Sequence, residues 1–316
     1  MSHEPLLEEA RPEMRPEAQV IPLNTDAADR LAHDSAGLEQ KVASALRFVR
    51  HRLSGEYEID EFGFDPELND QLLMPIARPL YERWFRAEML GLDNVPDDGA
   101  GLLVGNHSGT LPIDGVMLQV GLHDHHPAHR NLRLLGADLV YQIPVLAHLA
   151  RKSGHTLACQ ADAARLLAKD QLVGVFPEGF KGVGKSYSQR YKLQRFGRGG
   201  FVATALRAQV PIIPCAIVGA EEIYPKIADL KPLARLLGFP YFPVTPTWPL
   251  FGLLGLVPLP SKWLIAFGQP IQTDEYDPAQ ADDHMTVFNL TDQVRETIQN
   301  MLYDLLRRRG PAFFRA

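Results

Sequence analysis

A histidine and an aspartate stand close together in a polar segment that directly follows an apolar run. They are His107 and Asp114, within the sequence GNHSGTLPID at 105–114. An imidazole with one nitrogen held by a carboxylate can use the other nitrogen as a base. Because Gly109 and Pro112 disfavour a helix between them, we expect a loop that folds back, with Asp114 at or near the start of the next helix. The alternative is a turn histidine beside an aspartate that only caps that helix.

The segment LVGVFPEGFKGVGKS at 172–186 contains a pattern that is typical of phosphate binding. Its part from Gly179 to Ser186 matches the phosphate-loop pattern G-x4-G-K-[ST] after an apolar strand, which indicates nucleotide binding. A phosphate loop opens an amphipathic helix, whereas the residues that follow here, SYSQRYKLQRFGRGG, are polar, basic and rich in glycine. A phosphate-loop protein therefore remains an alternative function, and nucleotide binding measured with and without magnesium would test it.

Charge is distributed unevenly along the chain. The net charge is −6, and residues 1–37 hold eight acids and three bases, so the rest is nearly neutral. Residues 180–220 contain seven bases and no acid, which suits a phosphorylated ligand or an anionic surface. Because the chain is acidic overall and carries no recognised binding module, we expect no nucleic-acid partner. The seven bases are Lys181, Lys185, Arg190, Lys192, Arg195, Arg198 and Arg207.

Length and composition are those of an ordinary globular enzyme. The 316 residues, 46% of them hydrophobic, can form one large domain or two small ones. Cys159 and Cys215 lie in apolar runs and form no CxxC pair, which indicates a reducing cytoplasmic compartment. The histidines between 123 and 129 lack a second ligand segment, so we expect no metal. The first twenty residues do not read as an export signal.

The hydrophobic pattern predicts an α/β fold, with a mostly parallel mixed sheet of about seven strands flanked by helices and an N-terminal helical segment. We expect a disordered acidic tail over 1–37, N-terminal helices over 38–83, and an α/β domain over 84–316 that ends in a helix. The predicted strands are 87–92, 101–104, 132–135, 155–159, 172–176, 212–218 and 263–267. The predicted helices are 38–53, 72–85, 115–121, 147–152, 161–169, 199–207 and 283–309.

Residues 236–261 carry no charge but contain six prolines, which rule out a membrane-spanning helix. Their sequence, LLGFPYFPVTPTWPLFGLLGLVPLPS, places aromatic residues ahead of a short apolar stretch. This pattern fits a loop that dips into a membrane interface. It fits equally well a hydrophobic loop buried between two elements.

Three blocks in this order, NHSG..P.D, FPEG and VPIIPCAIVGAEE, together resemble the glycerolipid acyltransferase superfamily, which includes the lysophospholipid and 1-acylglycerol-3-phosphate acyltransferases. The resemblance covers about residues 84–270. It implies that His107 and Asp114 are catalytic and that the acceptor contacts Glu178 and Gly179. It also implies that Pro211 and Pro214 shape the wall of the site.

Two positions depart from the family pattern. The family aspartate stands five residues after the histidine, where this chain has Pro112, so its role must pass to Asp114. This resembles the branch related to mono- and diacylglycerol acyltransferases, in which the block varies. Gln160 stands where a phosphate-binding arginine is expected. The basic run would compensate, because lysine and arginine beside the site can also bind phosphate; the residues expected to do so are Lys181, Lys185 and Arg190.

The activity implied is O-acyl transfer from a thioester of CoA or acyl carrier protein to a glycerolipid hydroxyl, with a lysophospholipid or 1-acylglycerol-3-phosphate as acceptor. His107 would be the general base, oriented by Asp114, and backbone amides of 105–109 or 178–180 would stabilise the oxyanion. We expect no acyl-enzyme and no cofactor beyond the co-substrates. The expected location is the cytoplasmic face of a membrane, as a peripheral protein. A catalytically inactive lipid-binding member of the same fold is a further alternative.

Overall fold

The computed structural model describes residue 39 and residues 42–313, so the tail expected over 1–37 lies outside the described residues. The chain divides into two compact units after Ser54. The first contains a helix over residues 42–54. The second begins at Gly55 and contains the sheet and the candidate site. The expected N-terminal helical region 38–83 is therefore divided between the two units.

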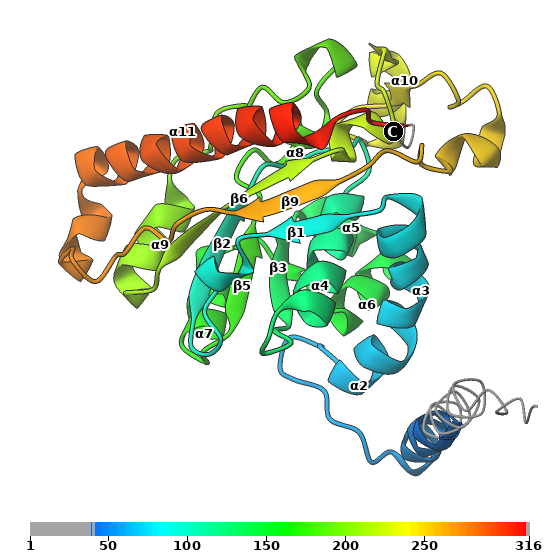
Figure 1. Ribbon diagram of the computed structural model, residues 1–316, viewed down its shortest axis with the longest axis horizontal. Helices are drawn as coiled ribbons and strands as arrows, with labels where there is room; N and C mark the ends of the chain where they lie inside the picture. Colours follow the sequence, from blue (N-terminus) through cyan, green and yellow to red (C-terminus); the bar gives the residue numbers. More distant parts are fainter. Residues whose placement is uncertain (1–38, 40–41, 314–316) are drawn as a thin grey trace, which may run out of the picture. The chain divides into compact units, whose positions relative to one another are not determined.

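A seven-stranded sheet of mixed direction forms the centre of the second unit, as the sequence predicts (Figure 1). The strand order is β1-β9-β6-β2-β5-β3-β4. Five neighbouring strands, from β6 to β4, are parallel, whereas β9 is antiparallel to β6 and β1 is parallel to β9. The strands are β1 (Glu88–Leu90), β2 (Gly101–Gly105), β3 (Leu132–Gly136), β4 (Thr156–Leu157), β5 (Leu172–Val175), β6 (Ile212–Val218) and β9 (Leu264–Phe267).

Helices connect the parallel strands, because a parallel pair needs a crossover that returns the chain to the starting edge. A separate pair of short strands, β7 (Ala228–Asp229) and β8 (Pro243–Val244), lies in the connection between β6 and β9. The α-helices are α2 (Pro66–Leu68), α3 (Met74–Pro79), α4 (Ile113–His125), α5 (Asp138–Gln142), α6 (Pro144–Lys152), α7 (Gln160–Leu167), α8 (Phe180–Val183), α9 (Gly200–Ala208), α10 (Lys231–Leu237) and α11 (His284–Arg309). Single turns of other helix types are η1 (Asn69–Leu73), η2 (Leu80–Trp84), η3 (Leu92–Asn94), η4 (Tyr187–Gln189), η5 (Ala220–Glu222), η6 (Gly252–Leu256) and η7 (Pro278–Asp282).

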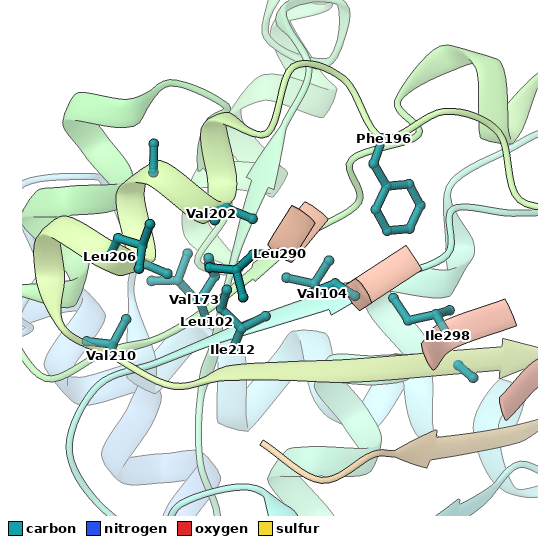
Figure 2. Packing of buried hydrophobic residues seen from close by; sticks show 14 of the residues in the cluster. Leu102, Val104, Val173, Phe196, Val202, Leu206, Val210, Ile212, Leu290 and Ile298 are labelled. Carbon is teal, nitrogen blue, oxygen red and sulfur yellow. The ribbon is translucent and has the colours of Figure 1, made fainter. Parts of the chain in front are cut away.

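Two hydrophobic cores cover the two faces of the sheet. Side chains alternate between faces along a strand, so Leu102 and Val104 of β2 belong to one core and Leu103 to the other. The first core is completed by α7, α9 and α11, as Figure 2 shows for Leu206 and Leu290. The second is completed by α4 and by residues of the 66–85 segment. Because helices cover both faces of the sheet, the loops meet at the ends of the strands.

Several predicted elements differ in extent from the structure, and for two of them the sequence contains the reason. Of the strand expected over 155–159, only Thr156–Leu157 pairs, because Cys159 is the N-cap of α7 and its sulfur accepts a hydrogen bond from the Asp162 N–H. The helical segment expected over 72–85 begins at Pro66, where the Asp65 side chain caps it and proline occupies the first turn. Both differences arise from helix-start signals that are clearer than the hydrophobic period around them.

Candidate active site

Asn106 determines where the chain leaves the sheet. It follows the last residue of β2, and its side chain is fully buried. The amide oxygen accepts a hydrogen bond from the Ile217 N–H at 2.7 Å, and the amide nitrogen donates to the Ile217 carbonyl at 3.0 Å. Asn106 thus bonds to β6 as a strand backbone would. The loop that begins at His107 therefore starts from a rigid point at the carboxyl end of β2.

His107 and Asp114 are in direct contact. The His107 Nδ1 lies 2.8 Å from the Asp114 Oδ2, and the Asp114 side chain is 0% exposed. The same oxygen accepts the Ser108 N–H at 2.9 Å. Because carboxylate oxygens accept, we assign the ring proton to Nδ1. Among the described residues no hydrogen bond uses Nε2, and the ring is 15% exposed. Nε2 is therefore free to accept a proton from a substrate.

The loop reaches this geometry by folding back, as predicted. Gly109 and Thr110 both have positive φ, of 94° and 59°, which reverse the chain between the two side chains. Asp114 is the second residue of α4, whose N-cap is Pro112, and it does not cap the helix. The His107 ring stacks on Phe176 at a centroid distance of 4.6 Å. The alternative of an aspartate that serves only as a cap is therefore wrong.

Glu178 holds the same loop from the other side. Its buried carboxylate accepts the His107 N–H at 3.0 Å through Oε1 and the Gln194 N–H at 2.6 Å through Oε2. Gly182 of α8 lies against the loop, since a Cβ there would stand 2.8 Å from the His107 carbonyl oxygen. Because the Glu178 side chain is 0% exposed and both its oxygens bond backbone N–H groups, this internal role replaces the expectation that Glu178 contacts the acceptor.

Lys185 lies inside the protein. Its side chain is 4% exposed, and its ammonium lies 3.0 Å from Glu221 and 3.4 Å from Glu178. Lys185 is therefore paired internally, which replaces the expectation that it contacts a substrate phosphate. After Ser186 the chain forms the single turn η4 where a phosphate loop would open an amphipathic helix. The phosphate-loop geometry is thus not the one this segment adopts.

Comparison with known proteins identifies the family. A family model described as Acyltransferase matches residues 86–218. An uncharacterized protein of Mycobacterium tuberculosis is 59% identical over 277 residues, which are 88% of this chain and 77% of that protein. The 1-acyl-sn-glycerol-3-phosphate acyltransferase alpha of Mus musculus is 31% identical over 159 residues, or 49% of this chain and 53% of the mouse protein. The chain belongs to the glycerolipid acyltransferase superfamily. Among solved structures, the 1-acyl-sn-glycerophosphate (LPA) acyltransferase of Thermotoga maritima is 16% identical, with 84% of this chain and 97% of that chain covered at a TM-score of 0.48.

Not every position matched to the superfamily blocks lies near His107. Pro211 precedes β6, and its carbonyl accepts the Leu102 N–H at the amino end of β2, so it lies at the opposite end of that strand from His107. Pro214 pairs with Val104 inside the sheet. Gln160 is exposed at the start of α7, where its amide donates to the Gly200 carbonyl. The expectation that Pro211 shapes the wall of the site is therefore wrong.

The other residues expected to contact a substrate are two exposed bases and one glycine. Lys181 is exposed on α8, one residue before Gly182. Arg190 is exposed, with its guanidinium over the Tyr187 ring at 4.4 Å. Gly179 takes the positive φ of 52° that a glycine adopts readily. Lys181 and Arg190 therefore have charges that solvent can reach, unlike Lys185.

Three of the backbone amides expected to stabilise an oxyanion are already bonded. The His107 N–H donates to Glu178 and the Ser108 N–H donates to Asp114. The Gly179 N–H donates to the Phe176 carbonyl. The amides of Gly109 and Phe180 remain candidates for this role.

Within the part of the chain that the structure describes, no group of three or more histidine, cysteine or acidic side chains could hold a metal ion. His123, in the last turn of α4, instead lies 3.2 Å from Asp70 and 2.8 Å from Asp124. The same part of the chain contains no helix with the length and apolar character required to cross a bilayer.

Sequence reasoning did not assign the carboxylates that follow β6. Glu221 pairs with Lys185, and Glu222 forms two bonds of 2.6 Å with Arg309 of α11. Burial raises the pKa of Glu221 to about 7, although Lys185 acts in the opposite direction. The only signal in the sequence is the adjacent pair of acids at the end of a strand.

This raised pKa predicts a pH-dependent stability. Since the folded protein binds the Glu221 proton more tightly than the unfolded chain, stability falls as the pH rises from the unfolded pKa of 4.5 through about 7. Between pH 5.5 and pH 8 we expect the wild type to lose about 2 kcal/mol more unfolding free energy than Glu221→Gln. Urea unfolding of both proteins at the two pH values measures this difference, and parallel losses would contradict it.

Proposed function

We propose that the protein is a glycerolipid O-acyltransferase that moves a fatty acyl group from an acyl thioester to a lipid hydroxyl. His107 is the general base in this proposal, and Asp114 orients its ring. The observation that carries the proposal is the 2.8 Å contact of the His107 Nδ1 with a fully buried carboxylate, which leaves Nε2 without a partner among the described residues. A hydroxyl is a poor nucleophile at neutral pH, so a base within hydrogen-bond reach is what this reaction requires.

The proposed reaction proceeds by direct transfer. The acceptor oxygen attacks the thioester carbonyl carbon while Nε2 takes the hydroxyl proton, and Asp114 stabilises the imidazolium that forms. The carbon–sulfur bond then breaks, and the imidazolium returns the proton to the departing thiolate. The products are an ester and a free thiol, and His107 is again neutral.

We propose a lysophospholipid or 1-acylglycerol-3-phosphate as the acceptor, and CoA or acyl carrier protein as the carrier of the acyl group. The name of the mouse relative supports this class of acceptor. The exposed charges of Lys181 and Arg190 also support it, because both can bind a phosphate. Gln160 offers no charge at the position where the family has an arginine.

An acyl-transfer assay on the purified protein tests this function. The acceptor panel contains lysophosphatidic acid, other lysophospholipids, glycerol 3-phosphate and monoacylglycerol, each with acyl-CoA and acyl carrier protein as donors. We expect the highest kcat/KM with a lysophospholipid or lysophosphatidic acid. A preference for monoacylglycerol would overturn the proposed acceptor, and absence of transfer to every acceptor would overturn the activity.

We further propose peripheral attachment to the cytoplasmic membrane face through the segment between α10 and β9. This segment exposes its apolar side chains, with Leu253 at 81%, so the alternative of a buried hydrophobic loop is wrong. A concentration of exposed apolar side chains of this kind is typical of an interaction site. Lys231 and Arg235 of α10 are exposed beside it, which favours an anionic membrane. The exposed apolar residues are Leu236, Leu237, Phe239, Leu250, Phe251, Leu253, Leu254, Leu256 and Val257.

Charged substitutions in this segment are expected to weaken membrane binding. Leu253→Asp/Leu254→Asp should reduce partitioning onto vesicles of phosphatidylcholine and phosphatidylglycerol by at least ~10-fold, because two apolar side chains no longer enter the interface. Sedimentation with vesicles measures the partition coefficient. The matched control is Met285→Asp/Phe288→Asp, which places the same charges on exposed apolar positions of α11. Equal partitioning of the two double variants would exclude the segment as the attachment site.

A further inference from the structure

The Lys185 ammonium is buried together with two carboxylates, one of which bonds the His107 loop. Lys185, Glu178 and Glu221 have side chains that are 4%, 0% and 5% exposed. The Lys185 Nζ lies 3.0 Å from the Glu221 Oε1 and 3.4 Å from the Glu178 Oε2, and it also donates to the Lys192 carbonyl. Charges removed from water in this way are tolerated only when they are paired.

We propose that Lys185 is a positioning residue for His107 and that it acts through Glu178. This inference rests on the function proposed above, because it concerns the same base. It gives a role to the lysine of the segment from Gly179 to Ser186, which resembles a phosphate loop without adopting its geometry.

The two oxygens of Glu178 have separate partners. Oε1 accepts the His107 N–H at 3.0 Å. Oε2 accepts the Gln194 N–H at 2.6 Å and faces the Lys185 ammonium. Lys185 therefore neutralises the carboxylate at one oxygen and leaves the other directed at the His107 backbone. A buried carboxylate needs a cation to compensate its charge, so the ammonium of Lys185 keeps Glu178 in the position from which it bonds the His107 N–H.

The chain between Glu178 and Lys185 brings these groups together. The four-residue helix α8 lies between them, and Gly182 and Gly184 permit the close packing. A Cβ at Gly182 would lie 2.7 Å from the Glu178 Cβ and 2.8 Å from the His107 carbonyl oxygen. A Cβ at Gly184 would lie 2.8 Å from the Phe180 carbonyl oxygen. The two glycines thus allow the FPEG block to pack closely against the His107 loop.

Hydrogen exchange at the His107 amide tests this role without any substrate. Lys185→Met leaves Glu178 without its cation, so we expect exchange at this amide to be at least ~10-fold faster than in the wild type. In the acyl-transfer assay, kcat should fall by ~10- to 100-fold while both KM values change by less than about 3-fold. Lys185→Arg keeps the charge and should restore both measurements to within about 3-fold of the wild type.

The matched control is Lys192→Met, which removes an exposed lysine from the same basic segment. Only the backbone carbonyl of Lys192 contacts Lys185, so the exchange rate at His107 should stay at the wild-type value. If Lys185→Met does not fold, Lys185→Met/Glu221→Gln removes one of the two uncompensated carboxylates and is measured in its place.

Wild-type exchange at the His107 amide in a folded variant that lacks the Lys185 charge would overturn the proposal, even if kcat were lower. An equal loss in Lys185→Arg would also overturn it, because the charge would then not be the cause. If the wild type transferred no acyl group at all, the proposed function would fail while the exchange measurement would still decide whether Lys185 holds the loop.

Discussion

Replacement of His107 by alanine is expected to lower kcat by about 10³-fold, within the range typical of positioned base catalysis. The variant keeps the Asp114 carboxylate bonded to the Ser108 N–H, but it has no imidazole to take the proton of the acceptor hydroxyl. Release of free thiol from acyl-CoA in the presence of lysophosphatidic acid measures the loss.

The fold should persist in this variant because the ring is partly exposed and its principal packing partner is the single ring of Phe176. Thermal unfolding should therefore remain cooperative. His125→Ala is the matched control, since it removes an exposed histidine at the end of α4. Activity of His107→Ala equal to that of the control would remove His107 from the mechanism.

Replacement of Asp114 by asparagine is expected to lower kcat by roughly 10²- to 10³-fold although the shape of the side chain is preserved. The Ser108 N–H and the His107 Nδ1 contact the same carboxylate oxygen, Oδ2, so an asparagine oxygen at this position would accept from both groups, while the NH₂ group would face the Gly115 N–H that Oδ1 accepts. The neutral amide would no longer stabilise the imidazolium that forms when Nε2 takes the proton of the acceptor hydroxyl, and its NH₂ group would leave the Gly115 N–H without an acceptor. Steady-state kinetics measures kcat, and the KM values should change little.

Asp283→Asn provides a matched control at another helix start. Asp283 caps α11 by accepting the Met285 and Thr286 N–H groups, and asparagine is nearly as good a cap. We expect this variant to keep wild-type kcat and to lose no more than about 1 kcal/mol of stability. If the two asparagine variants behaved alike, Asp114 would have no role in orienting His107.

The sheet and the contact between His107 and Asp114 could be predicted because both depend on residues close in the sequence. Apolar runs separated by helical stretches identify buried parallel strands. Gly109 and Pro112 exclude a helix between His107 and Asp114, so the two could meet only through a reversal of the chain. The structure contains this reversal, with positive φ at Gly109 and Thr110.

The role of Lys185 could not be predicted, because its partners are set by tertiary packing. One of them, Glu221, lies 36 positions along the chain and after a different strand. A lysine in a run of bases is typical of a solvated surface, and nothing local distinguishes the one that is buried. Pro211 shows the same limitation: its block matches the family, but only the strand register reveals that it lies beside Leu102, at the far end of β2.

The burial of the potential nucleophiles beside His107 has a kinetic consequence. Ser108 and Cys215 are both 0% exposed, and burial raises the pKa of the Cys215 thiol well above its usual range. Neither can receive an acyl chain from a donor that arrives from solvent. For the proposed reaction we therefore expect both substrates to occupy the enzyme at once, in a ternary complex. Double-reciprocal plots should intersect rather than run parallel. Exchange of label between CoA and acyl-CoA should require the acceptor to be present.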